Sequence, residues 1–294
     1  MKIINFGSLN IDHVYRVPHF VRPGESLPSE DYSVFAGGKG GNQSVALSRA
    51  EARVVHAGKI GADGRWLKDY LDKSSVDTSL ILEGSMPTGH AIIQVAPDGQ
   101  NSIIVYGGAN QAISSADVSA VLDSADAGDI LLLQNELNAT REIIENASRK
   151  GLIVVFNPAP MTADVRDLPL ASLRYIIVNE LEGAALAGVD VPQKIIGKLV
   201  SQLPDTGVVL TLGDKGVLYG SRDGNIEMPA ERVKALDTTA AGDTFTGYFL
   251  AEISRGAKLE AALRVAVRAA AICVTRKGAA DSIPTRREVV AEPI

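Results

Sequence analysis

Residues 130–160 read ILLLQNELNATREIIENASRKGLIVVFNPAP and contain two short apolar runs on either side of a helix-like segment. The runs Ile130–Leu133 and Leu152–Phe156 are typical of strands buried on both faces, and Thr140–Lys150 has helical spacing. The same alternation continues along the chain, with strands expected at Tyr175–Val178, Val208–Leu210, Lys2–Phe6 and Arg53–Ala57 and helices at Glu180–Ala187 and Gln193–Gln202. This pattern predicts an α/β fold: a doubly wound, mostly parallel sheet with helices on both faces.

Four other segments have a different pattern. Residues 13–20, 32–36, 88–95 and 101–106 alternate partly between polar and apolar side chains, and Pro97-Asp-Gly99 is a tight-turn signal between the last two. They predict a small antiparallel β-sheet that acts as a lid, with its strands inserted at about 12–36 and 88–106. Because these strands interleave with strands of the main sheet, we expect residues 1–294 to form a single domain.

Composition excludes several classes of function. The chain carries 29 basic and 35 acidic residues, so it lacks the excess positive charge of a nucleic-acid-binding protein. A single cysteine, Cys273, excludes an internal disulfide framework and a cysteine-rich zinc site. Arg264 and Arg268 interrupt the best apolar stretch, and Asn10 and Asp12 come too early for a signal-peptide core. We therefore expect a cytoplasmic protein with no nucleic-acid or membrane partner.

Polar side chains follow the expected strands at the point where each one ends. These side chains are Asn10 and Asp12, then Gln134, Asn135 and Glu136, then Asn157, Asn179 and Glu182, and finally Thr211. Any one of them could simply cap the following helix. Because the carboxyl ends of parallel strands share one edge of the sheet, the set as a whole predicts a polar cleft there.

Two glycine-bearing segments add to this cleft. Ala36-Gly-Gly-Lys-Gly-Gly-Asn42 precedes a helix expected from about Gln43. Its glycines allow the backbone to approach a ligand closely, while Lys39 and Asn42 can donate to hydroxyl or anionic oxygens. The alternative is an ordinary flexible turn.

The second segment, Asp237-Thr-Thr-Ala-Ala-Gly-Asp243, leads into a helix expected over Ala241–Ser254. Small residues at a helix start leave N–H groups free to bind an anion, such as a phosphoryl group in transfer. Asp243 would then accept the proton of the attacking hydroxyl. The alternative is that Asp243 only complements the helix dipole. The sequence contains no P-loop motif, no dinucleotide-binding G-x-G-x-x-G after a strand and no H-E-x-x-H motif.

Taken together, these segments resemble the ribokinase family of sugar kinases. The pieces that carry the resemblance are Gly7–His13, Ala36–Gln43, Asn157–Pro160, Asn179–Glu182, Thr211–Gly216, Asp237–Thr244 and Val274–Ala279. They occur in the order and spacing of that family and span nearly the whole chain. Glu51 and Trp66 stand where the family usually has glycine, and Val267 where it often has a polar residue on the adenine side.

The resemblance implies a role for each matching position. It implies that Asp243 is the base, with Ala240, Ala241 and Gly242 as the anion hole. It implies that sugar hydroxyls are bound by Asn10, Asp12, Gly38, Lys39, Asn42 and Glu136, together with Asp243. It implies nucleotide contacts at Asn179, Thr211, Leu212, Gly213, Asp214, Lys215, Gly216 and Gly242. It implies that Glu182 organises Mg²⁺ and that a K⁺ site forms from Asp237, Thr239, Val274, Lys277, Ala279 and Ser282.

The activity implied by the resemblance is transfer of the γ-phosphate of ATP to the 5-hydroxyl of D-ribose, giving D-ribose 5-phosphate. Deoxyribose, fructose or a nucleoside is the alternative acceptor, and a non-catalytic sugar sensor on the same fold is a further alternative. Because small isolated sheets are marginally stable, we also expect the lid strands to pair two chains into a homodimer.

Overall fold

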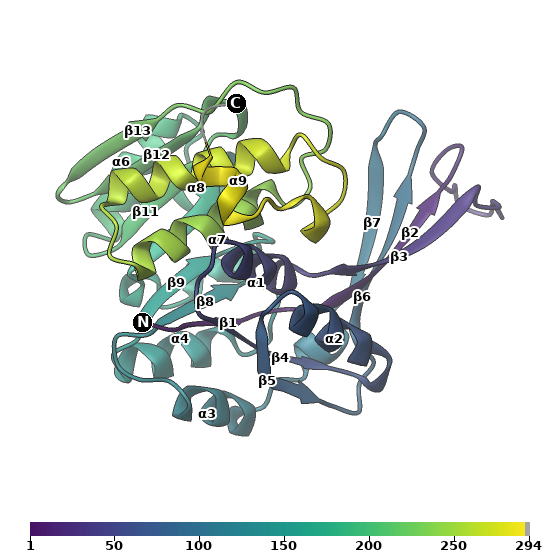
Figure 1. The fold of residues 1–294 in the computed structure, drawn as a ribbon, viewed down its shortest axis with the longest axis horizontal. Coiled ribbons are helices and arrows are strands. Elements are labelled where there is room, and N and C mark those ends of the chain that lie inside the picture. The colour runs from purple at the N-terminus through teal and green to yellow at the C-terminus, as the bar shows by residue number, and fades with distance from the viewer. Residues whose placement is uncertain (292–294) are drawn as a thin grey trace.

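The computed structural model describes residues 1–291 (Figure 1). Within these residues, nine strands form one sheet in the order β13-β12-β11-β10-β9-β8-β1-β4-β5, parallel from β11 to β5 and antiparallel at β12 and β13. The strands are β1 Ile3–Phe6, β4 Val54–Ile60, β5 Asp77–Glu83, β8 Ile130–Gln134, β9 Ile153–Asn157, β10 Tyr175–Asn179, β11 Gly207–Thr211, β12 Val217–Ser221 and β13 Gly224–Met228. The predicted fold class is confirmed.

Helices cover both faces of this sheet (Figure 1). They are α1 Lys39–Arg49, α2 Arg65–Lys73, α3 Ser115–Asp123, α4 Thr140–Arg149, α5 Glu180–Ala187, α6 Pro192–Gln202, α7 Ala241–Ser254, α8 Leu259–Cys273 and α9 Arg286–Val290. Successive strand residues point to opposite faces, so Ile3 belongs to the core that includes residues of α1, α2, α7, α8 and α9, whereas Ile4 belongs to the core that includes residues of α3 to α6. Among the described residues, no helix has the length and apolarity to cross a membrane.

The second sheet projects from the main body as a lid (Figure 1). Its strands, in the order β3-β2-β6-β7, are β2 Asn10–Arg16, β3 Asp31–Gly37, β6 Gly89–Val95 and β7 Asn101–Tyr106. The two hairpins, β2–β3 and β6–β7, are antiparallel as predicted, but the central pair β2–β6 is parallel. Each hairpin starts at the main body and runs outward, so their first strands point the same way when they meet.

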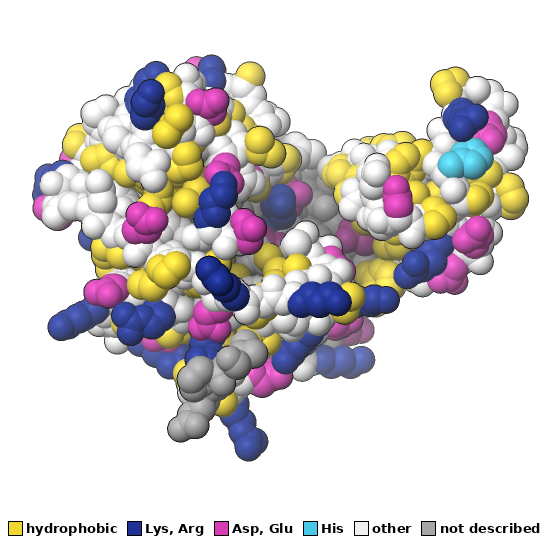
Figure 2. Space-filling model, turned by 90° about the horizontal axis from the view of Figure 1, so that it is seen from above, with side chains coloured by type: hydrophobic (Ala, Val, Ile, Leu, Met, Phe, Trp, Pro, Cys, Tyr) yellow, Lys and Arg dark blue, Asp and Glu magenta, His cyan; other side chains and the backbone are white. Residues whose placement is uncertain are grey.

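The lid also differs from the main body in its surface, because it carries exposed apolar side chains on both hairpins. Figure 2 shows it as an arm that stands away from the main body, with a hollow between the two and hydrophobic side chains spread over the arm. Side chains that are more than a third exposed include Tyr32, Phe35, Ile103, Ile104 and Val105.

Helix α1 begins earlier than predicted. It starts at Lys39 rather than near Gln43, so Gly40 and Gly41 lie inside it and Gly38, with φ +89°, is its N-cap. A Cβ on Gly40 would lie 2.4 Å from the backbone nitrogen of Ser8. The glycines therefore allow α1 to pack closely on the segment between β1 and β2, and the flexible turn that was the alternative is not what forms here.

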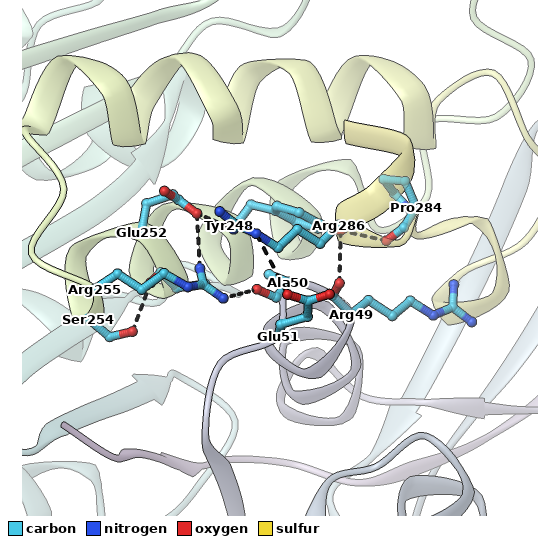
Figure 3. Close-up of polar contacts among 10 residues, drawn as sticks. Arg49, Ala50, Glu51, Tyr248, Glu252, Ser254, Arg255, Pro284 and Arg286 are labelled. Carbon is cyan, nitrogen blue, oxygen red and sulfur yellow. Dashed lines mark hydrogen bonds and ion pairs between the residues drawn. The ribbon is translucent and has the colours of Figure 1, made fainter. Parts of the chain in front are cut away.

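Helices α1 and α7 pack against each other along their length. A Cβ on Gly247 would lie 2.4 Å from that of Ala46, so a larger residue would force the helices apart. Figure 3 shows how the far end of this pair is fastened: Tyr248 Oη donates to Arg49 O at 3.3 Å and to Pro284 O at 2.7 Å, and Arg255 donates to Ala50 O. The opposite ends, the helix N-termini, meet at the carboxyl edge of the sheet.

Candidate active site

A cavity of about 230 Å³ opens at the carboxyl edge of the main sheet. It lies beyond the ends of β9, β10 and β11, and this edge is the usual ligand position in open α/β sheets. Its lining comes from the ends of β9, β10 and β11 and from the starts of α1, α5 and α7: Lys39, Asn157, Ala159, Ile177, Val178, Asn179, Glu182, Thr211, Thr238, Ala240, Ala241, Gly242, Asp243 and Thr246. The ends of three strands and both glycine-bearing segments thus meet at one cavity, whereas the polar residues after β1 and β8 do not line it: Asn10, Asp12, Gln134, Asn135 and Glu136.

The start of α7 presents free amides to this cavity. Ala240 is the N-cap in the left-handed conformation, φ +60°, which turns the chain sharply into the helix. Ala241 N–H donates to Thr238 O at 3.3 Å, whereas the N–H groups of Ala240, Gly242 and Asp243 have no acceptor among residues 1–291. A Cβ built on Gly242 would meet no atom within 4 Å, so the space above this residue is open. The helix start can bind an anion.

Asp243, in the first turn of α7, is buried and faces α1. Its Oδ2 accepts from Asn42 Nδ2 at 3.1 Å, although the two residues are 201 positions apart in the chain. Its Oδ1 accepts from Gln43 Nε2 at 2.9 Å. The carboxylate therefore lies at the junction between the two glycine-bearing segments.

Lys39 is the positive charge of the site. Burial alone would lower the pKa of its ammonium group, but the surrounding charges of Asp243, Glu136 and Glu182 raise the pKa above the ordinary value. An ammonium held among three carboxyl groups stays protonated at neutral pH. It can neutralise charge on a bound phosphate.

The predicted sugar-binding residues lie beside the cavity, at the base of the lid. Glu136 accepts from Lys39 N at 3.1 Å and from Ser8 Oγ, and burial raises its pKa. Burial, and then the charge of Glu136, raise the pKa of Asp12 to about 7. The backbone at Gly38 lies close to that of Asn10, since a Cβ built on Gly38 would be 2.9 Å from Asn10 N. Paired carboxylates and amides of this kind can satisfy both the donor and the acceptor needs of a polyol.

Asn179 and Glu182 form a capping box at the start of α5. Asn179 Oδ1 accepts from Glu182 N at 2.9 Å, and Glu182 Oε2 accepts from Asn179 N at 2.9 Å. Burial raises the pKa of Glu182. The local sequence Asn-Glu-Leu-Glu explains this geometry, because an N-cap amide and a carboxylate three residues later bond reciprocally. The cavity side of α5 therefore carries one fixed carboxylate.

Only part of the predicted nucleotide loop lines the cavity. Thr211 does, whereas Leu212 is buried with the apolar core of the α3–α6 face, so its side chain cannot contact a nucleotide. The next residues, Gly213, Asp214 and Lys215, form an exposed turn in which Lys215 Nζ lies 3.7 Å from a carboxylate oxygen of Glu180. Gly216, with φ +102°, follows this turn.

The residues of the predicted cation site come together behind the start of α7. Asp237 Oδ1 accepts from Thr239 N at 2.9 Å, and Asp237 Oδ2 accepts from Gly278 N at 3.0 Å. Val274 O accepts from Leu236 N at 2.7 Å, and Ser282 Oγ donates to Ala279 O at 2.7 Å. Lys277 is exposed nearby. Residues 1–291 hold no cluster of three or more His, Cys, Asp and Glu side chains placed to bind a metal ion.

Sequence reasoning missed two contributors. Asn110 is buried and donates from Nδ2 to Asn10 Oδ1 at 2.8 Å, which fixes the orientation of the Asn10 amide. Gln43 donates to Asp243, but the sequence pattern assigns it no role of its own. The Gly107-Gly108 pair before Asn110, similar to the glycines before Asn42, was the available signal for the first; nothing local distinguishes Gln43 from an ordinary helix residue.

Comparisons with known proteins show which family this chain belongs to. Residues 1–286 match the family described as pfkB family carbohydrate kinase. A ribokinase from Haemophilus influenzae is 40% identical, over 97% of this chain and 95% of that protein. The ribokinase structure from Thermotoga maritima is 38% identical with a TM-score of 0.90, covering 99% of this chain and 98% of that one. An Arabidopsis thaliana ribokinase solved with ribose and ATP is 29% identical with a TM-score of 0.88, covering 98% and 97%.

The match extends over nearly the entire chain and includes both segments that meet at Asp243. The chain therefore belongs to the pfkB family of carbohydrate kinases and is a phosphotransferase that acts on a sugar hydroxyl.

Proposed function

We propose that this protein transfers the γ-phosphoryl group of ATP to the 5-hydroxyl of D-ribose, giving D-ribose 5-phosphate and ADP. The observation that carries the proposal is the position of Asp243, which bonds to Asn42 of the polyol-type set and also lines the cavity with its free amides. The Arabidopsis thaliana relative complexed with ribose and ATP supports the choice of substrates.

In this proposal the chain acts by positioning and by neutralising charge. Asn10, Asp12, Gly38, Asn42 and Glu136 bind the sugar hydroxyls and direct one of them toward Asp243. The carboxylate accepts the hydroxyl proton as the oxygen bonds to the γ-phosphorus and the bond from that phosphorus to the ADP oxygen breaks. The amides of Ala240 and Gly242, with Ala241 beside them, and the Lys39 ammonium stabilise the negative charge on the transferring group.

The nucleotide would lie along Asn179 and the loop from Thr211 to Gly216. Mg²⁺, when bound, neutralises phosphate charge. Residues here fit that ion, because Mg²⁺ keeps several waters and uses one or two carboxylates with the substrate phosphates. Glu182 provides one such carboxylate on the wall of the cavity.

A K⁺ ion would be held by Asp237, Thr239, Val274, Lys277, Ala279 and Ser282, most of them through backbone carbonyls. The donor set is entirely oxygen and includes one carboxylate, and the pKa of Asp237 is lowered by hydrogen bonds from Thr239 and Gly278 despite partial burial. Asp237 and Thr239 lie directly before Ala240, whereas the other four residues follow α8. An ion there would order the loop that carries the free amides without contacting the sugar.

The alternative acceptors are deoxyribose, fructose and a nucleoside, because kinases of related sugars share much of the polyol set. A sugar sensor without activity is disfavoured, since both Asp243 and Gly242 are present. We also propose a homodimer formed through the lid, whose exposed side chains Ile103, Ile104 and Val105 a second copy would cover.

A coupled ADP-release assay over ribose, deoxyribose, fructose and adenosine, with and without K⁺, tests these proposals. Ribose should give the largest kcat/KM, and K⁺ should raise activity more than Na⁺. Asp243→Asn should lower kcat by about 10³-fold or more with sugar affinity retained.

The control is Glu260→Gln, which removes an acidic side chain from the first turn of α8, a residue that does not line the cavity. If Asp243 only complemented a helix dipole, the two variants would lose equally little activity. Retained turnover in Asp243→Asn would exclude its role as base.

A further inference from the structure

The Asp243 carboxylate is held by a second residue besides Asn42. Gln43 Nε2 lies 2.9 Å from Asp243 Oδ1 and 3.1 Å from Asn157 Oδ1, so both hydrogens of its amide have acceptors. Gln43 is fully buried and does not line the cavity. It therefore acts on the carboxylate from inside the protein, away from any substrate.

The orientation of the Gln43 amide matters, because its two ends have nearly the same shape and opposite polarity. With nitrogen toward Asp243 it donates to the carboxylate. If the amide oxygen of Gln43 faced Asp243 instead, two hydrogen-bond acceptors, the amide oxygen and a carboxylate oxygen, would be in contact. Something must therefore fix which end faces the carboxylate.

A chain of buried amides fixes this orientation. Gly40 O can only accept, and it takes a hydrogen bond from Asn5 Nδ2 at 2.7 Å, which leaves Asn5 Oδ1 facing Gln134. Gln134 Nε2 donates to Asn5 Oδ1 at 2.9 Å and to Gln43 Oε1 at 2.6 Å. Gln43 then has only its nitrogen left to present to Asp243. The carbonyl of Gly40 thus fixes which way the Asn5 amide faces, Asn5 fixes Gln134, and Gln134 fixes Gln43.

A second backbone carbonyl fixes the other contact of Gln43. Asn157 Nδ2 donates to Ile177 O at 2.9 Å, so Asn157 Oδ1 faces Gln43. Asn5, Gln43 and Gln134 are each fully buried, so water does not compete for these bonds. As the amides stand, Gln134 Oε1 is the one amide atom of these three side chains without a partner among the described residues. Reversing any one amide would place oxygen against oxygen or nitrogen against nitrogen and leave further buried groups unsatisfied, which is costly.

We propose that Gln43 is the positioning residue of the catalytic base, and that Asn5 and Gln134 act through it by fixing the direction of its amide. This inference rests on the proposed role of Asp243. Two donors, one on each oxygen, hold the carboxylate in one orientation, and its remaining lone pairs face the sugar hydroxyl. Loss of Gln43 would leave sugar binding intact and slow the chemical step.

The test uses Gln43→Met, Gln134→Met and the double variant in the full-length protein, because methionine has nearly the shape of glutamine but no donor. We expect Gln43→Met to lower kcat by about 30-fold and Gln134→Met by about 10-fold, with the sugar KM within about threefold of wild type. Because Gln134 acts through Gln43, the double variant should be no slower than Gln43→Met alone.

Thr206→Val is the matched control. Thr206 is also buried, and its hydroxyl donates to Leu173 O at 2.9 Å and to Leu170 O at 3.4 Å. Valine removes these contacts at a place unconnected to Asp243. It should lower the thermal midpoint about as much as the Gln134 variant and leave kcat unchanged. If Gln43→Met does not fold, Gln134→Met with this control still tests the proposal, since it does not touch Asp243.

Different results would overturn different claims. Turnover of Gln43→Met within threefold of wild type, with Asp243→Asn inactive, would overturn the positioning role and leave the proposed function standing. Losses that multiply in the double variant would overturn the link from Gln134 to Gln43. Full turnover in Asp243→Asn would overturn the role of Asp243 as base and this inference with it. Absence of ribose-dependent ADP release by the wild-type protein would overturn the proposed function itself.

Discussion

The contact between α1 and α7 contains polar side chains that are buried, whereas the surface of the lid carries apolar side chains that are exposed. At the helix contact, Asn42, Gln43 and Asp243 are polar and buried. On the lid, Ile104 and Val105 are apolar and more than half exposed, at 63% and 59%. Each region departs from the ordinary distribution of side chains, in which polar groups face water and apolar groups do not.

The comparison shows where each region finds its partners. Buried amides and carboxylates must be satisfied within the chain, and the hydrogen bonds between α1 and α7 do this while building the site. Exposed apolar side chains have no such partners in the chain, which is why we assign them to a second copy. The helix contact should therefore control the rate of reaction, and the lid the state of assembly.

After the loss expected for Asp243→Asn, the largest expected effect on activity comes from closing the open space at the start of α7. Gly242→Ala would place a methyl group in the cavity, displacing the phosphoryl group, and should lower kcat/KM for ATP by about 100-fold. Its thermal midpoint should not fall, since the new Cβ meets no atom within 4 Å.

Gly197→Ala in α6 is the control for this variant, because a Cβ there also meets no atom within 4 Å but lies outside the cavity. It should leave kcat/KM unchanged. Equal activity of the two alanine variants would show that the phosphoryl group does not lie above Gly242.

The second effect concerns assembly. Ile104→Glu combined with Val105→Glu places charges on both faces of β7 and should raise the dimer dissociation constant by at least about 100-fold, because each buried charge is costly. Sedimentation across a concentration series measures it. Val290→Glu, which alters a residue of equal exposure on α9, should remain dimeric. A wild-type protein that sediments as a monomer throughout would disprove the lid-mediated dimer.

The third effect is on stability and depends on pH. The pKa of Asp12 is about 7 in the folded protein and ordinary when unfolded, so its contribution to stability is full below about pH 4 and is lost as pH rises through 7. Asp12→Asn removes this dependence. It should raise the free energy of unfolding by about 2 kcal/mol more at pH 8 than at pH 5, while weakening sugar binding.

Chemical denaturation at the two pH values measures this difference. Asp98→Asn, in the exposed turn of the same lid, should change the free energy of unfolding by less than about 0.5 kcal/mol at both. A gain that is the same at pH 5 and pH 8 would mean that the charge of Asp12 is not destabilised by burial beside Glu136.

The smallest effect lies at the far end of α1. Glu51 has φ +60°, a conformation that favours glycine, and its contact with Arg286 is an exposed ion pair at 3.8 Å (Figure 3). Glu51→Gly should raise the free energy of unfolding by about 1 kcal/mol and leave kcat unchanged. Glu51→Ala keeps the strain and loses the ion pair, so it should be slightly less stable than wild type. A destabilised Glu51→Gly would show that the ion pair outweighs the strain.

Local pattern predicted much of the fold. Apolar runs predicted the bounds of β8 to β11 within a residue or two, because parallel strands that are buried on both faces consist of consecutive hydrophobic residues. Edge strand β5 and helices α2 and α3 were not predicted; β5 alternates between buried and exposed residues and has polar ends. The early start of α1 was also missed, since glycines suggest a turn unless the close packing of Gly40 on Ser8 is known.

The sequence by itself determined the class of fold, the polar strand ends and the amide-rich start of α7, because periodicity and helix-start chemistry are properties of neighbouring residues. Only the tertiary structure decided that Asn42 and Gln43 bond to a carboxylate 200 or so positions away, which end of each buried amide faces it, and that Asp12 lies close enough to Glu136 to change its pKa. Those facts depend on how α1, α7 and the sheet pack, and packing brings together side chains whose spacing along the chain carries no signal.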